Sequence, residues 1–508
     1  MPTIAFDALD YLADQRFAAA HYVLEGDELR GWQVLRDGNL ALELGPGYRL
    51  LRTKQCGICS TDLARHFLPF PLPQVIGHEV IATDEQGRRY VVEINASHEA
   101  RGVASECAFC RAGLATHCPE RLVLGIHDLP GGFGPWILAP VASCLPIPDN
   151  VPDSAAVLVE PFAAALHGVQ TIAPRAGECV AVLGPRRLGM LVVAALAGVR
   201  AREQRAGRDF GIAAIARDPA LLPLATSFGA TETHHLSPEA PPLADQSFDV
   251  VVDTTGNPDG LTTAVRLARR EVHLKSTHGQ PACGLGHLTE LVVDELSIEP
   301  FPAQQFPEQQ VPEQQIPEQQ IPEQQIPAQQ PGSGAGAWQR MATAVRPRVA
   351  WLAAQEPPAW LVEQADVRRG SATELAGHYH SLNDGLPRAD VAVVDSAAQV
   401  DAAIRPTSGS ELALVRPRGA VLVHPEANVG DSALLQAVVT RGLRLTSSRC
   451  GDFRAALDLL ATNPELRRIG ERLVTHHFAA DDLKEAFACA GSRACIKAVI
   501  SHGEETTA

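Results

Sequence analysis

Three short segments carry side chains that could bind one metal ion. Cys56-Gly-Ile-Cys-Ser-Thr-Asp62 supplies thiols, Gly77-His-Glu79 supplies an imidazole, and Leu158-Val-Glu-Pro-Phe162 supplies a carboxylate. Zinc takes sulfur, nitrogen and oxygen donors that converge from separate loops, and a catalytic zinc site keeps one position open. A thiolate, an imidazole and a carboxylate meet this requirement, so the three segments predict a catalytic metal site.

Glu160 is the most informative of these residues, because it interrupts the apolar run Ala155–Leu166. A carboxylate against a core costs free energy or acquires a raised pKa unless it is paired. A zinc ion is one such partner. A helix cap or an arginine partner is the alternative interpretation.

A glycine-bounded turn predicts a dinucleotide site. The apolar stretch Cys179–Leu183 is followed by Gly184-Pro-Arg-Arg-Leu-Gly189 and then by an apolar run with helical spacing. In a strand–turn–helix of this kind, backbone amides and the helix dipole face a pyrophosphate. Arg186 stands where a glycine would let the backbone approach the phosphates. Its side chain must therefore either obstruct them or swing out and contact them as a cation.

The next strand end bears on the choice of nucleotide. It reads Ile215-Ala-Arg-Asp218, so Ala216 occupies the position of the usual ribose-binding acid, and Arg217 follows it. An arginine there accommodates a 2′-phosphate, which favours NADP slightly over NAD. The alternative is that Arg217 is a solvated surface charge.

Two regions with different sequence patterns must form the elements that position these side chains. From about Trp32 to Pro148, short apolar runs separated by Gly and Pro predict an irregular β-rich domain. From Val151 onward, strands and helices alternate, which predicts a parallel sheet covered by helices on both faces. The expected strands are 179–183, 211–216 and 249–253, and the expected helices are 155–170, 188–199 and 219–228.

A proline- and glutamine-rich stretch interrupts the second half. Phe301–Gln330 consists of six pentads of the type Ile-Pro-Glu-Gln-Gln, and a glycine-rich segment follows to Ala337. A proline at every fifth position forbids regular helix or sheet, so we interpret the stretch as a spacer, with partner docking as the alternative. Around it, Asp249–Asp253 is echoed by Asp390–Asp395, and Arg269–Leu274 by Arg416–Leu422. Partial duplication and chance similarity both explain this echo.

The overall composition restricts partners and compartment. The chain has 508 residues, a formal net charge of −16 and eleven cysteines. An acidic balance argues against nucleic-acid or anionic-membrane partners, which need a basic face. With no secretory signal or transmembrane stretch in the sequence, we expect a cytoplasmic protein with reduced thiols.

Taken together, CGICSTD, GHE and EPFAAALHG closely resemble the medium-chain, zinc-containing alcohol dehydrogenase superfamily, in its threonine- and sorbitol-dehydrogenase-like branch. The resemblance covers about Gly31–Thr289 and Val438–Ile500. It implies a homo-oligomer, either dimer or tetramer, that acts on a small-molecule alcohol or carbonyl compound.

The resemblance also implies roles for individual residues. The catalytic zinc ligands would be Cys59, His78 and Glu160, with Glu79 beside the metal and Asp62 orienting the histidine. Thr61 would take the substrate hydroxyl proton. In relatives, a histidine at the position of Ala64 passes the proton on to solvent. This chain has a histidine only two positions later, at His66, so the residue that completes the proton path stays open. Thr255, in the turn Asp253–Asn257, would line the nicotinamide side of the cleft.

A second cysteine group resembles the structural-zinc lobe of the same superfamily. Cys107, Cys110 and Cys118 occupy three of its four ligand positions, but the fourth, three residues before Cys107, is Ala104. Three protein ligands leave a tetrahedral structural site incomplete. We therefore expect an empty lobe, unless Glu106 or His117 substitutes.

The expected fold is an α/β protein with a GroES-like β domain and a Rossmann-type doubly wound parallel sheet. The β domain would span 1–153 and be completed by about 446–508, and the Rossmann domain would span 154–300. A linker at 301–337 would lead to a segment at 338–445 that completes the Rossmann domain. The expected function is zinc-dependent hydride transfer between an alcohol or polyol and NAD(P). The alternative is a catalytically weak or inactive scaffold.

Overall fold

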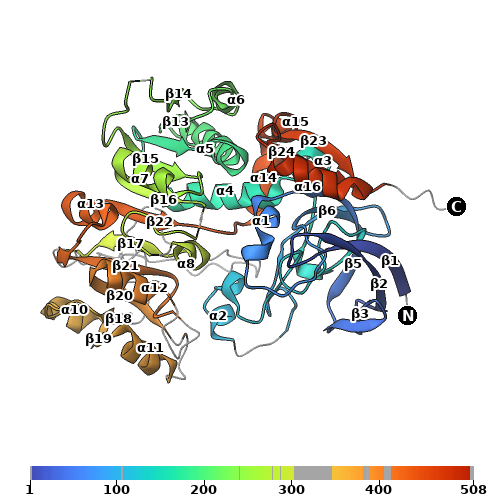
Figure 1. The fold of residues 1–508 in the computed structure, drawn as a ribbon, viewed down its shortest axis with the longest axis horizontal. Helices are drawn as coiled ribbons and strands as arrows, with labels where there is room; N and C mark the ends of the chain where they lie inside the picture. Colours follow the sequence, from blue (N-terminus) through green and yellow to red (C-terminus); the bar gives the residue numbers. More distant parts are fainter. Residues whose placement is uncertain are drawn as a thin grey trace, which may run out of the picture.

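The computed structural model describes residues 3–103, 107–239, 241–276, 279–286, 288–302, 346–381, 386, 388–405 and 413–503. Two units lie side by side, one rich in antiparallel β-structure and one built on a large sheet flanked by helices (Figure 1). The C-terminal segment returns to the β-rich unit, so both ends of the chain belong to it.

The β-rich unit contains two main antiparallel arrangements. The first is a four-stranded sheet in chain order, made of β1 (Thr3–Tyr11), β2 (Phe17–Asp27), β3 (Gly31–Arg36) and β4 (Asn39–Leu44). The second has the order β11-β7-β6-β5-β24-β23, and β10 also pairs with β5. Its strands are β5 (Tyr48–Gly57), β6 (Glu79–Thr83), β7 (Arg89–Val92), β10 (Trp136–Pro140), β11 (Cys144–Pro146), β23 (Val474–Ala479) and β24 (Lys497–Ser501).

The C-terminal strands are therefore integral to this sheet. β24 pairs antiparallel with β5 and parallel with β23, which places Lys497 beside the start of the Cys59 loop.

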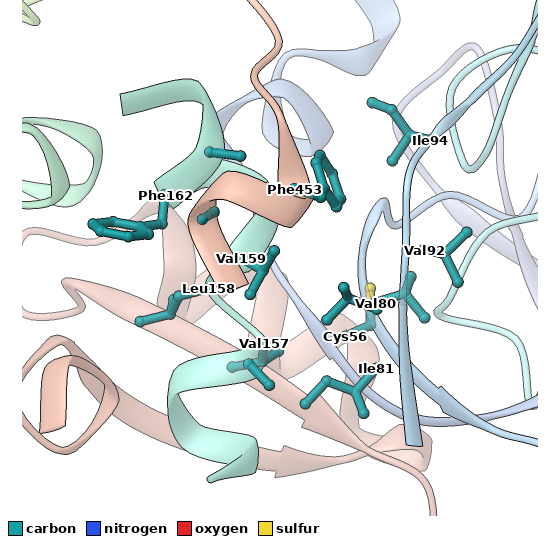
Figure 2. Close-up of a cluster of buried hydrophobic side chains, with 14 of the residues drawn as sticks. Cys56, Val80, Ile81, Val92, Ile94, Val157, Leu158, Val159, Phe162 and Phe453 are labelled. Carbon is teal, nitrogen blue, oxygen red and sulfur yellow. The ribbon is translucent and has the colours of Figure 1, made fainter. Parts of the chain in front are cut away.

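Helices α3 (Asp153–Ala156) and α4 (Val159–Ile172) join the two units. Val157, Leu158 and Val159 belong to a hydrophobic cluster that also contains Val80 and Ile81 of β6 and Phe453 of α14 (Phe453–Thr462) (Figure 2). This apolar wedge fixes the first turn of α4, which carries Glu160. The single helix expected over 155–170 is two helices, because the chain turns at Val157 and Leu158.

The large sheet begins with a parallel half. Its order is β14-β13-β12-β15-β16-β22, formed by β12 (Cys179–Leu183), β13 (Gly211–Ala216), β14 (Glu232–His235), β15 (Phe248–Asp253), β16 (Ala268–Leu274) and β22 (Arg444–Ser447). The helices between these strands are α5 (Arg187–Arg205), α6 (Leu221–Ser227) and α7 (Pro258–Leu267). The strands expected from the sequence agree with β12, β13 and β15.

The same sheet continues into a second parallel half with the order β17-β21-β20-β18-β19. Its strands are β17 (Ser297–Pro300), β18 (Arg348–Trp351), β19 (Asp366–Arg369), β20 (Ala389–Ser396) and β21 (Val415–Asn428). Its helices are α10 (Ala359–Gln364), α11 (Ala372–His380), α12 (Ala397–Ile404) and α13 (Ala433–Arg441). The halves meet where β17 and β22 pair antiparallel, at Ile298 and Leu445.

The two halves share one strand pattern. β12, β13, β15 and β16 correspond in order and direction to β18, β19, β20 and β21. The echoed sequences fall on corresponding strands, β15 with β20 and β16 with β21. The final strands are exchanged, because β17 precedes the second half in the chain but joins it, and β22 follows that half but joins the first. Duplication stays a prediction, which this correspondence supports.

The predicted fold class is confirmed, since an antiparallel β-rich unit accompanies a large, mostly parallel sheet. The pentad spacer from residue 303 onward lies outside the described residues. Phe301, at its start, packs against Trp351 and His424, with ring centroids 5.6 and 5.9 Å away. No helix among the described residues is both long and apolar enough to cross a membrane.

Candidate active site and metal centre

One cavity of about 820 Å³ receives residues from both units. It is lined by every residue that the sequence assigned to catalysis and to nucleotide binding: Cys59, Thr61, His78, Glu79, Glu160, Gly184, Arg186, Leu188, Gly189, Arg217 and Thr255. Cavities of this size bind small molecules and cofactors in other proteins.

Cys59 and His78 form the centre of the predicted metal site. Cys59 precedes the short helix α1 (Ser60–Leu63), and its backbone N–H donates to Asp62 Oδ2 at 2.7 Å. The other oxygen of Asp62 lies 3.1 Å from His78 Nδ1. Burial alone would lower the pKa of His78, but Asp62 and a hydrogen bond with Cys59 raise it well above its usual value. Asp62 thus orients the imidazole beside the thiol, as a residue supporting a metal ligand does.

Glu160 faces the same cavity from the first turn of α4. Desolvation raises its pKa to about 7, although His78 and Lys497 lower it. Among the described residues, however, the ligand atoms of Cys59, His78 and Glu160 do not all lie within 4.8 Å of one another. The structure therefore pairs the first two and does not gather the carboxylate with them.

The donor chemistry nevertheless fits a zinc ion. A thiol and an imidazole are already in contact, and a carboxylate with a raised pKa lines the same space. A cation offsets the cost of holding such a carboxylate away from water. Completing the set requires Glu160 to approach the other two ligands.

Lys497 is a charged member of the site that the sequence analysis missed. Its ammonium pairs with Glu79 Oε2, and both side chains are almost completely buried, at 4% and 1% exposed. Lys497 Nζ also donates to Ile58 O at 3.0 Å, which ties β24 to the Cys59 loop. The available signal was a lone lysine within the apolar stretch Cys495–Ile500, which needs an anionic partner when buried.

Lys275 was missed in the same way. It follows the buried strand β16, lines the cavity and donates to Ser448 O and Arg449 O at 3.0 and 2.9 Å. Burial lowers its pKa to about 8.

Of the residues considered for proton transfer, some line the cavity and others lie outside it. Thr61 and Ala64 line the cavity. His66 Nδ1 instead lies 3.5 Å from the Tyr11 hydroxyl, and its ring lies tilted against that of Phe67. Cys56 is fully buried and packs among apolar side chains (Figure 2).

The nucleotide turn depends on two glycines. Gly184 has φ = +82°, and a Cβ there would lie 2.9 Å from Thr255 Cγ2. A Cβ on Gly189 would lie 2.7 Å from both Gly184 O and Thr254 Oγ1. Larger residues would therefore push β12, the turn and the start of α5 apart.

Arg186 swings out of the turn, one of the two outcomes expected from the sequence. Its guanidinium donates to the carbonyls of Ser492, Arg493 and Cys495 at 2.6, 3.2 and 2.8 Å. Arg187 donates to Ile496 O at 2.9 Å and to Ser60 Oγ at 3.2 Å. Together they connect the turn to the C-terminal segment and to the residue after Cys59.

A second metal-binding constellation lies in the cysteine lobe, which includes α2 (Ala108–Arg111). The ligand atoms of Cys107, Cys110, Cys118 and His98 lie within 4.8 Å of one another. His98 Nδ1 is 3.2 Å from Cys118 Sγ and 3.7 Å from Cys110 Sγ, and Cys107 Sγ is 4.0 Å from Cys118 Sγ. Three thiols and an imidazole form a candidate structural zinc site.

The structure adds a fourth candidate donor, His98, to the three cysteines expected from the sequence. His98 Nε2 contacts Glu120 Oε2 at 3.0 Å, an arrangement that orients metal-binding imidazoles. His117, the proposed substitute, instead contacts Val293 O at 3.1 Å, and Glu106 lies outside the described residues. Ligand spacing along the chain does not identify His98, because this donor arrives from a neighbouring turn.

The chain is similar to known proteins in one matched domain, in sequence and in fold. Residues 45–149 match the alcohol dehydrogenase GroES-like domain. The chain is 29% identical over 241 residues to L-threonine 3-dehydrogenase of Aeromonas salmonicida, covering 44% of this chain and 66% of that enzyme. It is 29% identical over 249 residues to L-galactonate-5-dehydrogenase of Escherichia coli, covering 44% and 67%.

Curated relatives are thus matched over only about half to two thirds of their own length. Similarity in fold extends further. A short chain alcohol dehydrogenase from Escherichia coli CFT073, solved in complex with NADH, superposes with a TM-score of 0.52 over 98% of this chain and 99% of that one, at 15% identity. Residues 45–149 thus form an alcohol dehydrogenase GroES-like domain, and the chain is similar in sequence to members of the medium-chain zinc alcohol dehydrogenase superfamily.

Proposed function

We propose that this protein is a zinc-dependent oxidoreductase that transfers hydride between an alcohol or polyol, or the corresponding carbonyl compound, and NAD(P). The observation that carries the proposal is that Cys59, His78, Glu160 and the turn Gly184–Gly189 line one cavity. A metal-binding set and a dinucleotide turn on opposite units are the two parts that such a reaction must bring together.

In this proposal the two units have separate tasks. Residues 1–153 with about 446–508 form the catalytic unit, and residues 154–300 form the nucleotide-binding unit, which β22 completes. The substrate hydroxyl lies beside Cys59 and His78, and Thr61 accepts its proton. Asp62 keeps the His78 ring in place, and the Lys497–Glu79 pair holds the start of β24 against the Cys59 loop.

A zinc ion and a nicotinamide nucleotide would supply the remaining chemistry. A zinc ion held by Cys59, His78 and Glu160 would act as a Lewis acid that lowers the pKa of the alcohol. A nicotinamide nucleotide held by Gly184, Leu188, Gly189 and Thr255 would exchange hydride with the carbinol carbon. Arg217 at the cavity wall favours NADP slightly, and a solved neighbour in fold binds NADH.

Relatives suggest the substrate class. The matched proteins are named for a hydroxy amino acid and for a sugar acid, so secondary alcohols, polyols and hydroxy acids are the substrates to test first. We also expect a cytoplasmic homo-oligomer, with no nucleic-acid or membrane partner.

The deciding experiment compares Cys59→Ser with Cys179→Ser in the full-length protein. Cys179 lies on β12 and does not line the cavity, so it is a matched thiol control. We expect turnover of the substrate panel with NADP or NAD to vanish in Cys59→Ser and persist in Cys179→Ser. Fluorescence titration should show NADPH binding to both variants. Full turnover by Cys59→Ser would disprove the proposed chemistry.

The scaffold alternative makes a different prediction. Arg186 is engaged with carbonyl groups, and the three catalytic donors are not gathered, as a weak or inactive relative would allow. A protein that binds neither NADPH nor NADH at millimolar concentration and turns over none of the panel would be such a scaffold.

A further inference from the structure

A third group of metal-binding side chains lies outside the active-site cavity and the cysteine lobe. The ligand atoms of His476, Cys489 and Cys495 lie within 4.8 Å of one another. Cys495 is fully buried, and the other two side chains are partly buried. Two thiols and an imidazole in mutual reach are a donor set for zinc, with a fourth position open to water or another ligand.

Three elements bring these residues together. His476 lies on β23, Cys489 on the last turns of α16 (Leu483–Gly491), and Cys495 in the turn before β24. β23 pairs with β24, which fixes the His476 side of the cluster to the strand that follows Cys495. The donors therefore come from a strand, a helix and a turn that already pack as one unit.

A hydroxyl group orients the imidazole. Thr475 Oγ1 lies 2.9 Å from His476 Nδ1, and it accepts the backbone N–H of Ile496 at 3.0 Å. It also lies 4.0 Å from Cys495 Sγ. Metal-binding histidines are held in this way, with one ring nitrogen in a hydrogen bond and the other free for a ligand role.

The cluster adjoins the segment that the nucleotide turn holds. Arg186 donates to Cys495 O at 2.8 Å, and Arg187 donates to the carbonyls of Ile496 and Ala490. The side chains of Arg186 and Arg187 thus restrain the backbone between Cys489 and Ile496 on one side. A zinc ion shared by the two thiols would restrain the same backbone on the other side.

We propose that His476, Cys489 and Cys495 form a zinc site that braces the turn before β24. It is separate from the proposed catalytic centre and does not depend on it. Binding would deprotonate the thiols and link α16, β23 and β24 through one ion, so it should stabilise the folded protein by mass action.

The test counts metal in the intact chain. Wild-type protein, Cys489→Ser and Cys179→Ser are each loaded with excess zinc, gel-filtered and analysed for metal per chain. We expect Cys489→Ser to hold one zinc equivalent fewer than wild type and Cys179→Ser to hold the same number. Equal metal content in Cys489→Ser and wild type would overturn the proposal.

A second measurement uses wild-type protein alone, in case the variant does not fold. Zinc should slow iodoacetamide alkylation of Cys489 about tenfold, because the thiol is consumed as a ligand. Peptide mapping by mass spectrometry reports each cysteine separately, and Cys179 should react at an unchanged rate. Alkylation of Cys489 at the same rate with and without zinc would also overturn the site.

Discussion

Charged side chains that are almost completely buried distinguish the wall of the active-site cavity. Lys497 pairs with Glu79, Asp62 with His78, and Lys275 donates to carbonyl groups of the chain after β22. Such groups are retained only where partners offset their desolvation. Their pairing fixes the Cys59 loop, the His78 turn and the C-terminal strands relative to one another before any ligand binds.

Substitution of the single residue Arg217 tests whether the protein prefers NADP to NAD. Arg217 is exposed at the cavity wall, where a 2′-phosphate could reach it. Arg217→Ala should weaken NADPH binding about tenfold, or about 1.4 kcal/mol, and leave NADH binding unchanged. Fluorescence titration measures both constants. Arg200→Ala, which removes a half-buried partner of Asp209 that does not line the cavity, is the control. Equal affinity of Arg217→Ala and wild type for NADPH would identify Arg217 as a solvated charge.

His98 tests the composition of the cysteine lobe. His98→Ala should remove about one zinc per chain and lower the melting temperature, because three thiols do not complete a tetrahedral site. Metal analysis and thermal unfolding measure the two effects. His117→Ala should keep its zinc, since His117 contacts Val293 O instead of the thiols. Unchanged zinc in His98→Ala would mean that another group is the fourth ligand.

The limits of sequence reasoning are clearest among these residues. Cys59, His78, Glu160 and the glycine turn could be assigned because local motifs carry their chemistry. Lys497 and His98 could not, because each reaches its site through strand pairing or a neighbouring turn. Arg186 was an open choice in the sequence. Its outcome depends on free carbonyls of the C-terminal turn, which only the folded chain brings close.

At the scale of elements, the strands β16 and β22 and the turn before β17 are connected by buried polar contacts. His273 on β16 lies 2.8 Å from Thr446 Oγ1 and 2.9 Å from Ser448 Oγ, and Thr446 Oγ1 donates to Glu271 at 2.7 Å. The positions of β12, β13 and β15 followed from apolar runs in the sequence. These cross-links did not, since they join residues more than a hundred positions apart.

Glu295 is the acidic centre of one such connection. It precedes β17 and accepts from Arg418 Nε at 2.9 Å and from the Arg449 backbone at 2.8 Å, with His167 Nδ1 3.4 Å away. Burial raises the pKa of Glu295, but Arg418, His167 and His117 lower it by more. The net result is a pKa of about 2. The ionised form is therefore favoured by folding.

The sign of its pH dependence follows. Above the ordinary pKa of 4.5 the contribution of Glu295 is complete, and it is lost as the pH falls towards about 2. Glu295→Gln should lower the free energy of unfolding by about 3 kcal/mol at neutral pH and reduce its fall between about pH 5 and pH 3. Urea unfolding at several pH values measures both. The exposed Glu426→Gln should match wild type, and an unchanged pH slope in Glu295→Gln would contradict this role.

At the scale of the whole molecule, the two parallel halves belong to one large sheet. No single stretch of the sequence shows that they are joined. Buried side chains of both halves, among them Leu183, Val251, Val394 and Val421, belong to one hydrophobic cluster. β17 and β22 are exchanged between the halves, so each half needs a strand from the other's part of the chain. The sequence echo suggested relatedness, but the exchange depends on three-dimensional strand order.

The junction between the halves should therefore control the stability of both. Leu445 and Ile298 face each other there and are fully buried. Leu445→Asp should cost about 3–5 kcal/mol, because it places an unpaired charge in the shared core. Hydrogen exchange followed by mass spectrometry should show faster exchange of β12 and β18 together. Leu40→Asp, at a side chain 57% exposed, should leave both protected. Faster exchange in β12 with β18 still protected would mean that the halves unfold independently, and the strand exchange would then not couple them.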